Sequence, residues 1–459
     1  MGLNVAPPAG VSRELVATFN GWRYEDIPSE VVERLKLLVL DTLGVIAAAS
    51  GQREVDIVSR RLTRWSVGGS ATVLLGKTKM PPPFAALING TAAHALDFDD
   101  IHDAARVHTF AVLLPALLAV AEDEGGVSGR DFLLALAIGA ELNARLGLAA
   151  PRTLAIGWHP STILGAVSTG LAVARLMGLD TARQLGALGF GHHLAAGSSE
   201  SILSGAPSKR VGLGFAAQAG VMAASLAADG ISGPGEPLAG RAGLFALQQR
   251  GEVDPAQLVA DLGQRWEILA YQVKPYPCCR CCHSAISLGV GLHGDGVAPD
   301  AVARIDIALS RLNAETVGAV YEPARNSPSH AQFNAAFCFA AALADGQVGV
   351  STFTPARFAD PRLVSLAART QVHADPSIPE EAMEPARVRL TLRDGTVVER
   401  AFAGASVFDA GTVLRKSRTC FLEGLGAGPE AVARLEEAVF GLDRLADASA
   451  LAAAFPARA

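Results

Sequence analysis

Apolar residues recur at helical spacing from the start of the chain to about residue 265, and this pattern constrains the fold more than any other feature. After Pro28, which is typical of a helix start, one apolar face continues to the neighbourhood of Ser50 and Gly51. The positions on this face are Leu35, Leu38, Thr42, Val45 and Ile46. Further apolar stretches at 111–122, 162–177 and 214–228 predict helices that are buried on most faces and form a layered core.

Two further helix starts can be placed from their capping residues. Ser128 and Asp131 resemble a capping box at the start of an apolar helix over 132–148. Asp180 can cap the helix that follows it, because its side chain accepts from free backbone N–H groups. The first part of the chain is therefore predicted to be a helical bundle.

The pattern changes after about residue 268. Residues 303–309 alternate as a half-buried strand does, and 388–392 with 396–402, joined by Asp394-Gly395, predict a β-hairpin. An apolar helix is expected at 332–344 between them, and helical spacing returns from about 407. We therefore expect a mainly α protein, in which a large all-helical domain (1–268 plus 407–459) carries an inserted, smaller α+β lid domain (269–406). The crevice between two such domains is a favoured place for a ligand.

Composition excludes several classes of protein. Half of the 459 residues are hydrophobic and only 18% are charged, as in a compact globular protein rather than a disordered one. The net charge of -6 and the lack of Lys/Arg-rich runs argue against a nucleic-acid partner. The first residues do not resemble a signal peptide, and the uncharged stretches 153–174 and 211–228 are interpreted as buried helices rather than membrane spans. We expect a soluble cytoplasmic protein without a membrane partner.

A set of polar residues between positions 97 and 283 is not needed for folding. Its members include Asp97, His108, His159, Lys209 and Lys274. Dispersed histidines, lysines and an aspartate suit a pocket for a small anionic substrate, in which proton-transfer groups lie beside cationic carboxylate donors. This combination favours an enzyme.

The two histidines have different alternatives. His159 is the first choice for proton transfer, because an imidazole titrates near neutral pH and His159 precedes Pro160 at a predicted helix start, where an anion is favoured. The alternative is a loop histidine bonded to backbone. His108 is a second acid, base or carboxylate donor, and otherwise a surface histidine entering the helix that starts near Ala111.

The charged candidates have alternatives as well. Asp97 can orient a histidine or act as a base, and otherwise caps a helix or forms a salt bridge. Lys209 and Lys274 are predicted to bind carboxylates, although a lone lysine is usually solvated. Arg210 and Arg280 lie beside them in sequence and can take that role instead.

Metal sites are not expected. Asp99 and Asp100 lack a matching second acidic cluster for Mg²⁺, and the overlapping CxxC pairs of 278–282 lack a second pair of ligands for zinc. The six cysteines are predicted to be reduced thiols. Cys279 can be a nucleophile beside Lys274 and Arg280, but a small pocket-lining residue is the simpler interpretation. His283 is expected to begin a helix and to line the pocket or cap that helix.

Taken in order, these motifs resemble the MmgE/PrpD family, which includes 2-methylcitrate dehydratase, cis-aconitate decarboxylase and iminodisuccinate epimerase. The segments that carry the resemblance are 40–44, 89–100, 157–160, 209–217, 274–279 and 283. Each is weak alone, and together they form a specific signal across nearly the whole chain. The resemblance implies a helical domain with a smaller α+β lid, in a homodimer. It also implies site roles for Asp97, His108, His159, Lys209 and Lys274, with Tyr321 as the counterpart of a lid tyrosine.

Four departures from the family pattern concern the substrate. Ile101 stands where the family often has threonine, and Cys279 stands where the decarboxylase has histidine. Gly212 stands where a histidine is common, and His108 is followed by Thr109 and Phe110 rather than by Pro-Ser. These changes leave the chemistry intact and leave the substrate open.

The sequence therefore predicts a cofactor-independent and metal-independent lyase, of the 2-methylcitrate dehydratase type, acting on a small di- or tricarboxylate. His159 and His108 would move protons, Asp97 would orient them, and Lys209 and Lys274 would bind carboxylates. The alternatives are an epimerase of the iminodisuccinate type, a decarboxylase of the cis-aconitate type, and a non-catalytic carboxylate-binding homologue.

Overall fold

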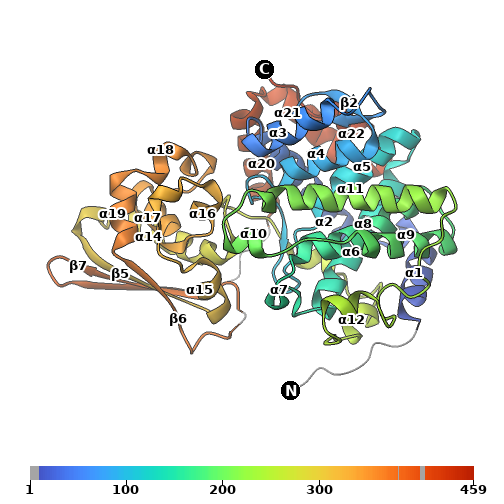
Figure 1. Cartoon of the computed structure of the whole chain (residues 1–459). Helices are drawn as coiled ribbons and strands as arrows, with labels where there is room; N and C mark the ends of the chain where they lie inside the picture. The colour runs from blue at the N-terminus through green and yellow to red at the C-terminus, as the bar shows by residue number, and fades with distance from the viewer. Residues whose placement is uncertain (1–9, 381, 404–408) are drawn as a thin grey trace.

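The computed structural model describes residues 10–380, 382–403 and 409–459 and shows two bodies side by side (Figure 1). The helical body has a core built from residues of 11–271 together with residues of 420–455. The smaller body has its own core, built from residues of 278–390. The chain thus leaves the helical body once and returns to it.

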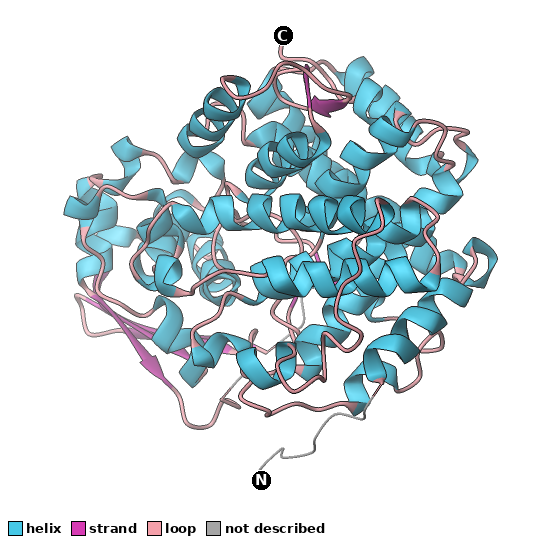
Figure 2. Ribbon diagram, turned by 45° about the vertical axis from the view of Figure 1, so that its right-hand side comes forward, coloured by secondary structure: helices cyan, strands magenta, loops and turns pink. Residues whose placement is uncertain are grey.

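The helical body is a bundle of long helices with short ones at its edges (Figure 2). The long helices are α1 (Val11–Gly21), α2 (Ser29–Ala48), α3 (Arg53–Thr63), α4 (Pro82–His94), α5 (Phe110–Glu124), α6 (Gly129–Ala149), α8 (Pro160–Leu176), α9 (Thr181–Leu194), α11 (Ser208–Ala228), α20 (Ala410–Leu425) and α21 (Pro429–Phe440). The short ones are α7 (Thr153–Ile156), α10 (Glu200–Leu203), α12 (Leu244–Gln248), α13 (Ala256–Val259) and α22 (Ala450–Ala454). The predicted helices of this region are confirmed, α11 beginning six residues earlier than expected.

The predicted helix starts are also confirmed. The Ser128 hydroxyl accepts from the backbone N–H of Asp131 at 3.1 Å, and the Asp180 carboxylate accepts from that of Arg183 at 2.9 Å. Each cap satisfies an N–H group that the first turn of a helix leaves free.

Helix α20 closes the bundle over α2, although more than 360 residues separate the end of α2 from the start of α20. Small residues allow the contact. A Cβ added to Gly44 would lie 3.0 Å from the Cα atom of Ser417, and one added to Gly424 would lie 2.0 Å from the carbonyl oxygen of Ala47. The two helices can pack this closely only because both positions lack a side chain.

The smaller body is a four-stranded sheet covered by helices. Its strands are β5 (Val302–Leu309), β6 (Thr370–Ala374), β7 (Ala386–Leu392) and β8 (Val397–Phe402), in the order β6-β5-β7-β8. β5 and β6 are parallel and the other pairs are antiparallel. Its helices are α14 (His283–Gly294), α15 (Arg311–Val317), α16 (Pro328–Gln332), α17 (Ala335–Asp345), α18 (Pro355–Phe358) and α19 (Pro361–Ala368). The predicted β7–β8 hairpin and the strand β5 are confirmed.

Two short strand pairs in the helical body were not predicted. They are β1 (Ala71–Val73) with β2 (Thr78–Met80), and β3 (Ile101–His102) with β4 (Tyr271–Gln272). The second pair matters for the site, because it ties the segment after Asp97 to the segment that leads to Lys274.

Two helices, α6 and α11, are long and apolar enough to cross a membrane by length and composition alone. In α6, 94% of the apolar window is buried inside the fold, and in α11 56% is buried. Helix α6 is therefore a core helix of the bundle, whereas α11, which contains the stretch 211–228 predicted to be buried, is only partly buried.

Candidate active site

Asp97 is the centre of a buried cluster of charged groups. Its carboxylate accepts from Lys274 Nζ at 2.6 Å and from Lys209 Nζ at 3.1 Å. Lys274 Nζ also donates to the Asp97 carbonyl oxygen at 3.0 Å. Asp97 has a φ of 51°, in the left-handed region, where aspartate is tolerated better than most residues. This turn after α4 places both the carboxylate and the carbonyl of one residue against the same ammonium group.

The charges in this cluster stabilise one another. Burial alone would raise the pKa of Asp97, but the Lys209 and Lys274 ammonium groups together pull it well below its usual value. Burial likewise disfavours the charge on Lys274, but Asp97 and Asp99 outweigh burial and raise the pKa of Lys274. Lys209 and Lys274 thus bring two ammonium groups to one carboxylate, and ammonium groups are donors that suit an anionic ligand.

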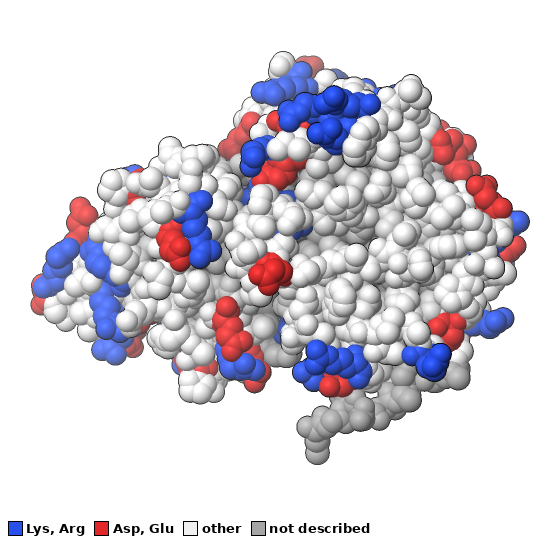
Figure 3. Space-filling view, in the orientation of Figure 1, with Lys and Arg blue, Asp and Glu red and all other residues white. Residues whose placement is uncertain are grey.

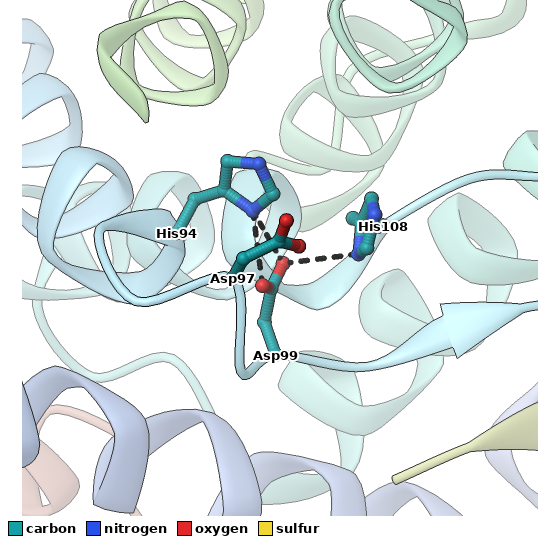
Figure 4. A group of neighbouring side chains, drawn as sticks. All are labelled: His94, Asp97, Asp99 and His108. Carbon is teal, nitrogen blue, oxygen red and sulfur yellow. Dashed lines mark hydrogen bonds and ion pairs between the residues drawn. The ribbon is translucent and has the colours of Figure 1, made fainter. Parts of the chain in front are cut away.

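A second layer of histidines and aspartates lies behind Asp97 (Figure 4). His94, the last residue of α4, has its Nδ1 atom 2.9 Å from both carboxylate oxygens of Asp99 and its Nε2 atom 2.8 Å from Lys209 Nζ. The His108 Nδ1 atom lies 2.7 Å from the Asp100 carbonyl oxygen and 3.4 Å from the Asp99 carboxylate. The ring centroids of His94 and His108 are 4.9 Å apart.

His159 lies at the edge of this cluster, at the N-terminus of α8. Helix α8 begins at Pro160, directly after His159, as predicted, and the His159 ring centroid is 6.3 Å from that of His94. Burial, followed by the positive charge of Lys209, lowers the pKa of His159 well below its usual value. Burial, followed by Lys274, does the same to the pKa of His108. Both imidazoles are therefore neutral at neutral pH and can accept a proton.

The aspartates of the 97–100 run have separate tasks. Asp100 caps α5, because its carboxylate accepts from the backbone N–H groups of Thr109 and Phe110 at 3.0 Å each. Burial, followed by the neighbouring Asp99, raises the pKa of Asp100 well above its usual value. The sequence left two structural roles open for Asp97, a helix cap or a salt bridge. In the structure Asp100 caps the helix, and Asp97 forms the salt bridges.

Lys416 of α20 supports the run from behind. Its Nζ atom lies 2.8 Å from the Asp41 carboxylate of α2, donates to the Phe98 carbonyl at 2.6 Å and lies 3.9 Å from the centre of the Phe98 ring. Burial raises the pKa of Asp41 to about 6, although Lys416 opposes the shift.

The smaller body closes over the cluster through Gln332 and Phe333. The Gln332 carboxamide donates to the Leu96 and Pro277 carbonyls, both at 2.8 Å, and accepts from Arg210 at 2.8 Å. The Phe333 ring lies 5.0 Å from Lys209 Nζ, within range of a cation–π contact. Arg210 and Arg280 are thus engaged in contacts outside the Asp97 cluster, Arg280 with Asp103 at 3.0 Å.

Two predicted site residues, Tyr321 and His283, lie outside the cluster of Asp97, His108, His159, Lys209 and Lys274. The Tyr321 hydroxyl donates to the Phe358 carbonyl at 3.0 Å, and its ring stacks on His330 and Phe337 in the smaller body. His283 begins α14, as expected, and its Nε2 atom lies 3.3 Å from the Cys278 carbonyl oxygen. Their predicted roles in substrate binding stay predictions.

Cys279 lies near Asp97 and Lys274, whose charges both act on its thiol. A hydrogen bond with Cys281, followed by burial, raises the pKa of Cys279 well above its usual value. A thiol that stays protonated is a poor nucleophile. The raised pKa therefore argues against Cys279 as a nucleophile, and its role as a pocket-lining residue stays a prediction.

Two departures from the family pattern can be placed. Ile101 is buried in β3 and pairs with Gln272 of β4. A Cβ added to Gly212 of α11 would lie 3.0 Å from the Thr162 Cγ2 atom. Thr162 therefore packs where a side chain at position 212 would begin.

The donor atoms of His94, Asp97, Asp99 and His108 lie within 4.8 Å of one another, close enough for a metal ion. The chemistry of the set does not favour one. Lys209 Nζ already lies between His94 Nε2 and Asp97, and Lys274 Nζ holds the other Asp97 oxygen. A divalent cation here would face two ammonium groups at close range.

A cavity of about 390 Å³ lies between the two bodies. Its walls include Leu96, Arg210, Pro277 and Gln332, which are sequence neighbours of Asp97, Lys209, Lys274 and Phe333. Within the described chain the Asp97 cluster itself is almost closed to solvent, since Asp97, His159 and Lys209 are each about 5% exposed.

Sequence reasoning missed His94, Asp99 as its partner, Gln332 and Lys416. His94 lies inside the 89–100 motif, three residues before Asp97, so its position close to Asp97 could have been predicted from the sequence. Gln332 and Lys416 carry no local signal, because the residues of the 89–100 motif that they contact, Leu96 and Phe98, are more than 200 residues away in sequence.

Comparisons with known proteins agree with this arrangement. The MmgE/PrpD N-terminal domain matches residues 13–255 and the MmgE/PrpD C-terminal domain matches residues 276–424. A cis-aconitate decarboxylase-like protein oryM of Aspergillus oryzae is 30% identical over 470 residues, covering 97% of each chain. A cis-aconitate decarboxylase of Aspergillus terreus is 29% identical over 474 residues, with 96% of this chain and 95% of that protein covered. The cis-aconitate decarboxylase of Homo sapiens is 26% identical over 396 residues, with 84% and 81% covered.

Proposed function

The chain belongs to the MmgE/PrpD family, and on that premise we propose that it is a metal-independent lyase that acts on a small di- or tricarboxylate at the Asp97 cluster. The observation that carries the proposal is the convergence of Lys209 and Lys274 on one buried carboxylate, beside neutral His108 and His159. Such a site holds anionic carboxylates and moves a proton at a neighbouring carbon.

The roles follow from the charge states. Lys209 and Lys274 hold substrate carboxylates and stabilise the extra charge that develops on one of them in the transition state. Neutral His159 takes up or delivers the proton at carbon, and His108 is the second proton carrier. Binding of a polyanion raises the proton affinity of both imidazoles, so each can carry a proton once the substrate is in place.

Decarboxylation of a cis-aconitate-like tricarboxylate is the first reaction to test, because the relatives named above are cis-aconitate decarboxylases. In that reaction the C–CO₂ bond breaks and its electron pair forms a new C=C bond. The electron pair of the old C=C bond takes a proton from an imidazolium, and CO₂ leaves.

Dehydration of a 2-methylcitrate-like substrate is the second candidate, favoured by two observations. His159 is neutral at rest, as a base that removes a proton from carbon must be. Cys279 stands where the decarboxylase has histidine. Epimerisation beside a carboxylate, and carboxylate binding without turnover, use the same groups.

One set of assays separates these reactions. We expect CO₂ release from cis-aconitate, or alkene formation from 2-methylcitrate, in the wild-type protein. His159→Gln should lower kcat by about 100-fold or more, the range for loss of a general acid or base. His193→Gln, an exposed histidine of α9, is the matched control and should be unchanged. Solvent deuterium in recovered, inverted substrate would indicate an epimerase instead, and ligand-induced thermal stabilisation without turnover would contradict catalysis.

We also propose that the protein is a cytoplasmic homodimer, as the sequence predicted. Supporting this, Figure 3 shows a face of the helical body, around α11, with few charged side chains. Helix α11 exposes Phe215 and Met222 there, and Leu194 and Leu203 are also exposed nearby in sequence. Phe215→Glu with Met222→Glu should convert the dimer to a monomer in light scattering, and a wild-type monomer would contradict the proposal.

A further inference from the structure

His94 lies between a carboxylate and an ammonium group and is fully buried. Its Nδ1 atom is 2.9 Å from both oxygens of Asp99, and its Nε2 atom is 2.8 Å from Lys209 Nζ. Both ring nitrogens therefore have a polar partner, and the partners are of opposite charge. The proton-transfer scheme above uses His159 and His108 and leaves His94 without a task.

The position of the ring proton follows from the partners. A lysine ammonium group can only donate, so Nε2 must be the nitrogen that accepts, and the proton must be on Nδ1. The Nδ1–H group then donates to Asp99. Burial, followed by Lys209, lowers the pKa of His94 well below its usual value, which keeps the ring neutral in this form. Asp99 thus fixes the tautomer that presents a lone pair to Lys209.

The three N–H groups of Lys209 can now be accounted for. One is directed to His94 Nε2 at 2.8 Å and one to the Asp97 carboxylate at 3.1 Å. The Phe333 ring, 5.0 Å from Nζ, covers the ammonium from the smaller body without accepting a conventional hydrogen bond. Among the residues that the structure describes, no acceptor is found for the third N–H group, which is left for a ligand, and its direction is set by the other two.

We propose that His94, held by Asp99, is a positioning residue that aims the third N–H group of Lys209 at a substrate carboxylate. The inference rests on the proposed function in one respect, that Lys209 binds a carboxylate. His94 acts through Lys209 and touches no reacting atom. Asp99 acts one step further away, through the tautomer of His94.

The two ring nitrogens can be tested separately. In His94→Asn the side-chain amide lies where Nδ1 lies, so it keeps a donor for Asp99 and removes the acceptor for Lys209. In His94→Gln the longer side chain can place its carbonyl oxygen where Nε2 lies, which restores the acceptor. A residue that only fills space would give the same result in both variants.

The expected result is a difference in substrate affinity. His94→Asn should raise KM by about tenfold, with a smaller change in kcat, because a misdirected charged hydrogen-bond donor binds the substrate carboxylate less well. His94→Gln should stay within about threefold of wild type. Equal losses in the two variants that follow their melting temperatures would overturn the proposal, as would unchanged KM in both.

A second variant covers the case in which position 94 tolerates no change. Asp99→Leu keeps much of the side-chain volume but removes the acceptor for the Nδ1–H group, so the ring is no longer held with its Nε2 lone pair toward Lys209. We expect the same rise in KM as in His94→Asn. Wild-type KM in a folded Asp99→Leu protein would contradict the tautomer argument.

Failure of the proposed function can be told from failure of this inference by measuring citrate binding calorimetrically. If wild type binds citrate but turns over none of the substrates, catalysis is contradicted, and the ratio of citrate Kd values between His94→Asn and His94→Gln still decides the inference. If wild type binds neither citrate nor cis-aconitate, both proposals fall together.

Discussion

The ion pair between Asp97 and Lys274 offers the sharpest test of the geometry, because the free energy lost on removing one partner should depend on whether the other partner is present. Lys274 is 1% exposed and Asp97 is 4% exposed, and the two are joined at 2.6 Å. Removing one partner of a buried pair leaves an uncompensated charge and costs about 3–5 kcal/mol. We therefore expect Asp97→Asn, which leaves two buried ammonium groups without their carboxylate, to lower the free energy of unfolding by about 3–5 kcal/mol. Lys274→Met should cost less, because Lys209 still pairs with Asp97 at 3.1 Å.

The double variant should be less damaged than the sum of the singles. Asp97→Asn alone leaves both ammonium groups without this carboxylate, whereas in Lys274→Met with Asp97→Asn only Lys209 loses it, and Lys209 still donates to His94. The coupling free energy should be about 3 kcal/mol, the upper range for residues in direct contact. Replacement by methionine keeps most of the lysine side-chain volume, so cavity effects are small.

Urea unfolding followed by tryptophan fluorescence measures this coupling in the right part of the protein. The four tryptophans, Trp22, Trp65, Trp158 and Trp266, all belong to the helical body. The exposed pair Arg130–Glu25, 3.2 Å apart, is the matched control and should couple by less than about 1 kcal/mol. A coupling between Asp97 and Lys274 as small as that of the control would refute the buried-pair reasoning.

Four further outcomes are expected. The pKa of Asp97 is lowered in the folded state, so its contribution to stability is present above its unfolded pKa and is lost as pH falls through the folded pKa. Lys274→Met removes one of the two ammonium groups that lower this pKa, and it should therefore move acid unfolding to higher pH. Cys279→Ser should change kcat by less than about threefold, because a protonated thiol is no nucleophile, and loss of turnover would restore the nucleophile hypothesis. Dialysis against a chelator should leave activity unchanged, and recovery only with an added divalent metal would contradict metal independence. Gln332→Leu should speed proteolysis of the links between the two bodies, since two hydrogen bonds across the interface, to Leu96 and from Arg210, are lost, and an unchanged cleavage rate would count against closure by Gln332.

Local patterns predicted most of the helices, because the apolar spacing and the capping residues of each helix lie within one continuous segment. The stripe after Pro28 became α2, Ser128 capped α6, and the His159-Pro160 pair began α8. The hairpin around Asp394-Gly395 also formed, with Gly395 at a φ of 88°. In each case the free energy that decides the structure comes from neighbours a few residues away.

Long-range contacts could not be predicted from the sequence. The pairing of His102 with Tyr271, which brings Lys274 to Asp97, needs partners about 170 residues apart. Lys416 reaches the site from α20, and no pattern near position 416 indicates that. Because the site is assembled by long-range contacts, its residues were identified with the help of the MmgE/PrpD resemblance. That resemblance gave no role to His94, whose role is inferred from its distances to Asp99 and Lys209.

The way α20 packs on α2 also governs how a ribosome makes this protein. Helix α2 is complete early in synthesis, but the surface that α20 covers stays bare until residues 410–425 have left the exit tunnel. Folding during translation generally proceeds from the N-terminus, so the nascent helical body must wait with apolar surface exposed while the smaller body emerges. A chaperone that binds nascent chains would meet its best target in that interval.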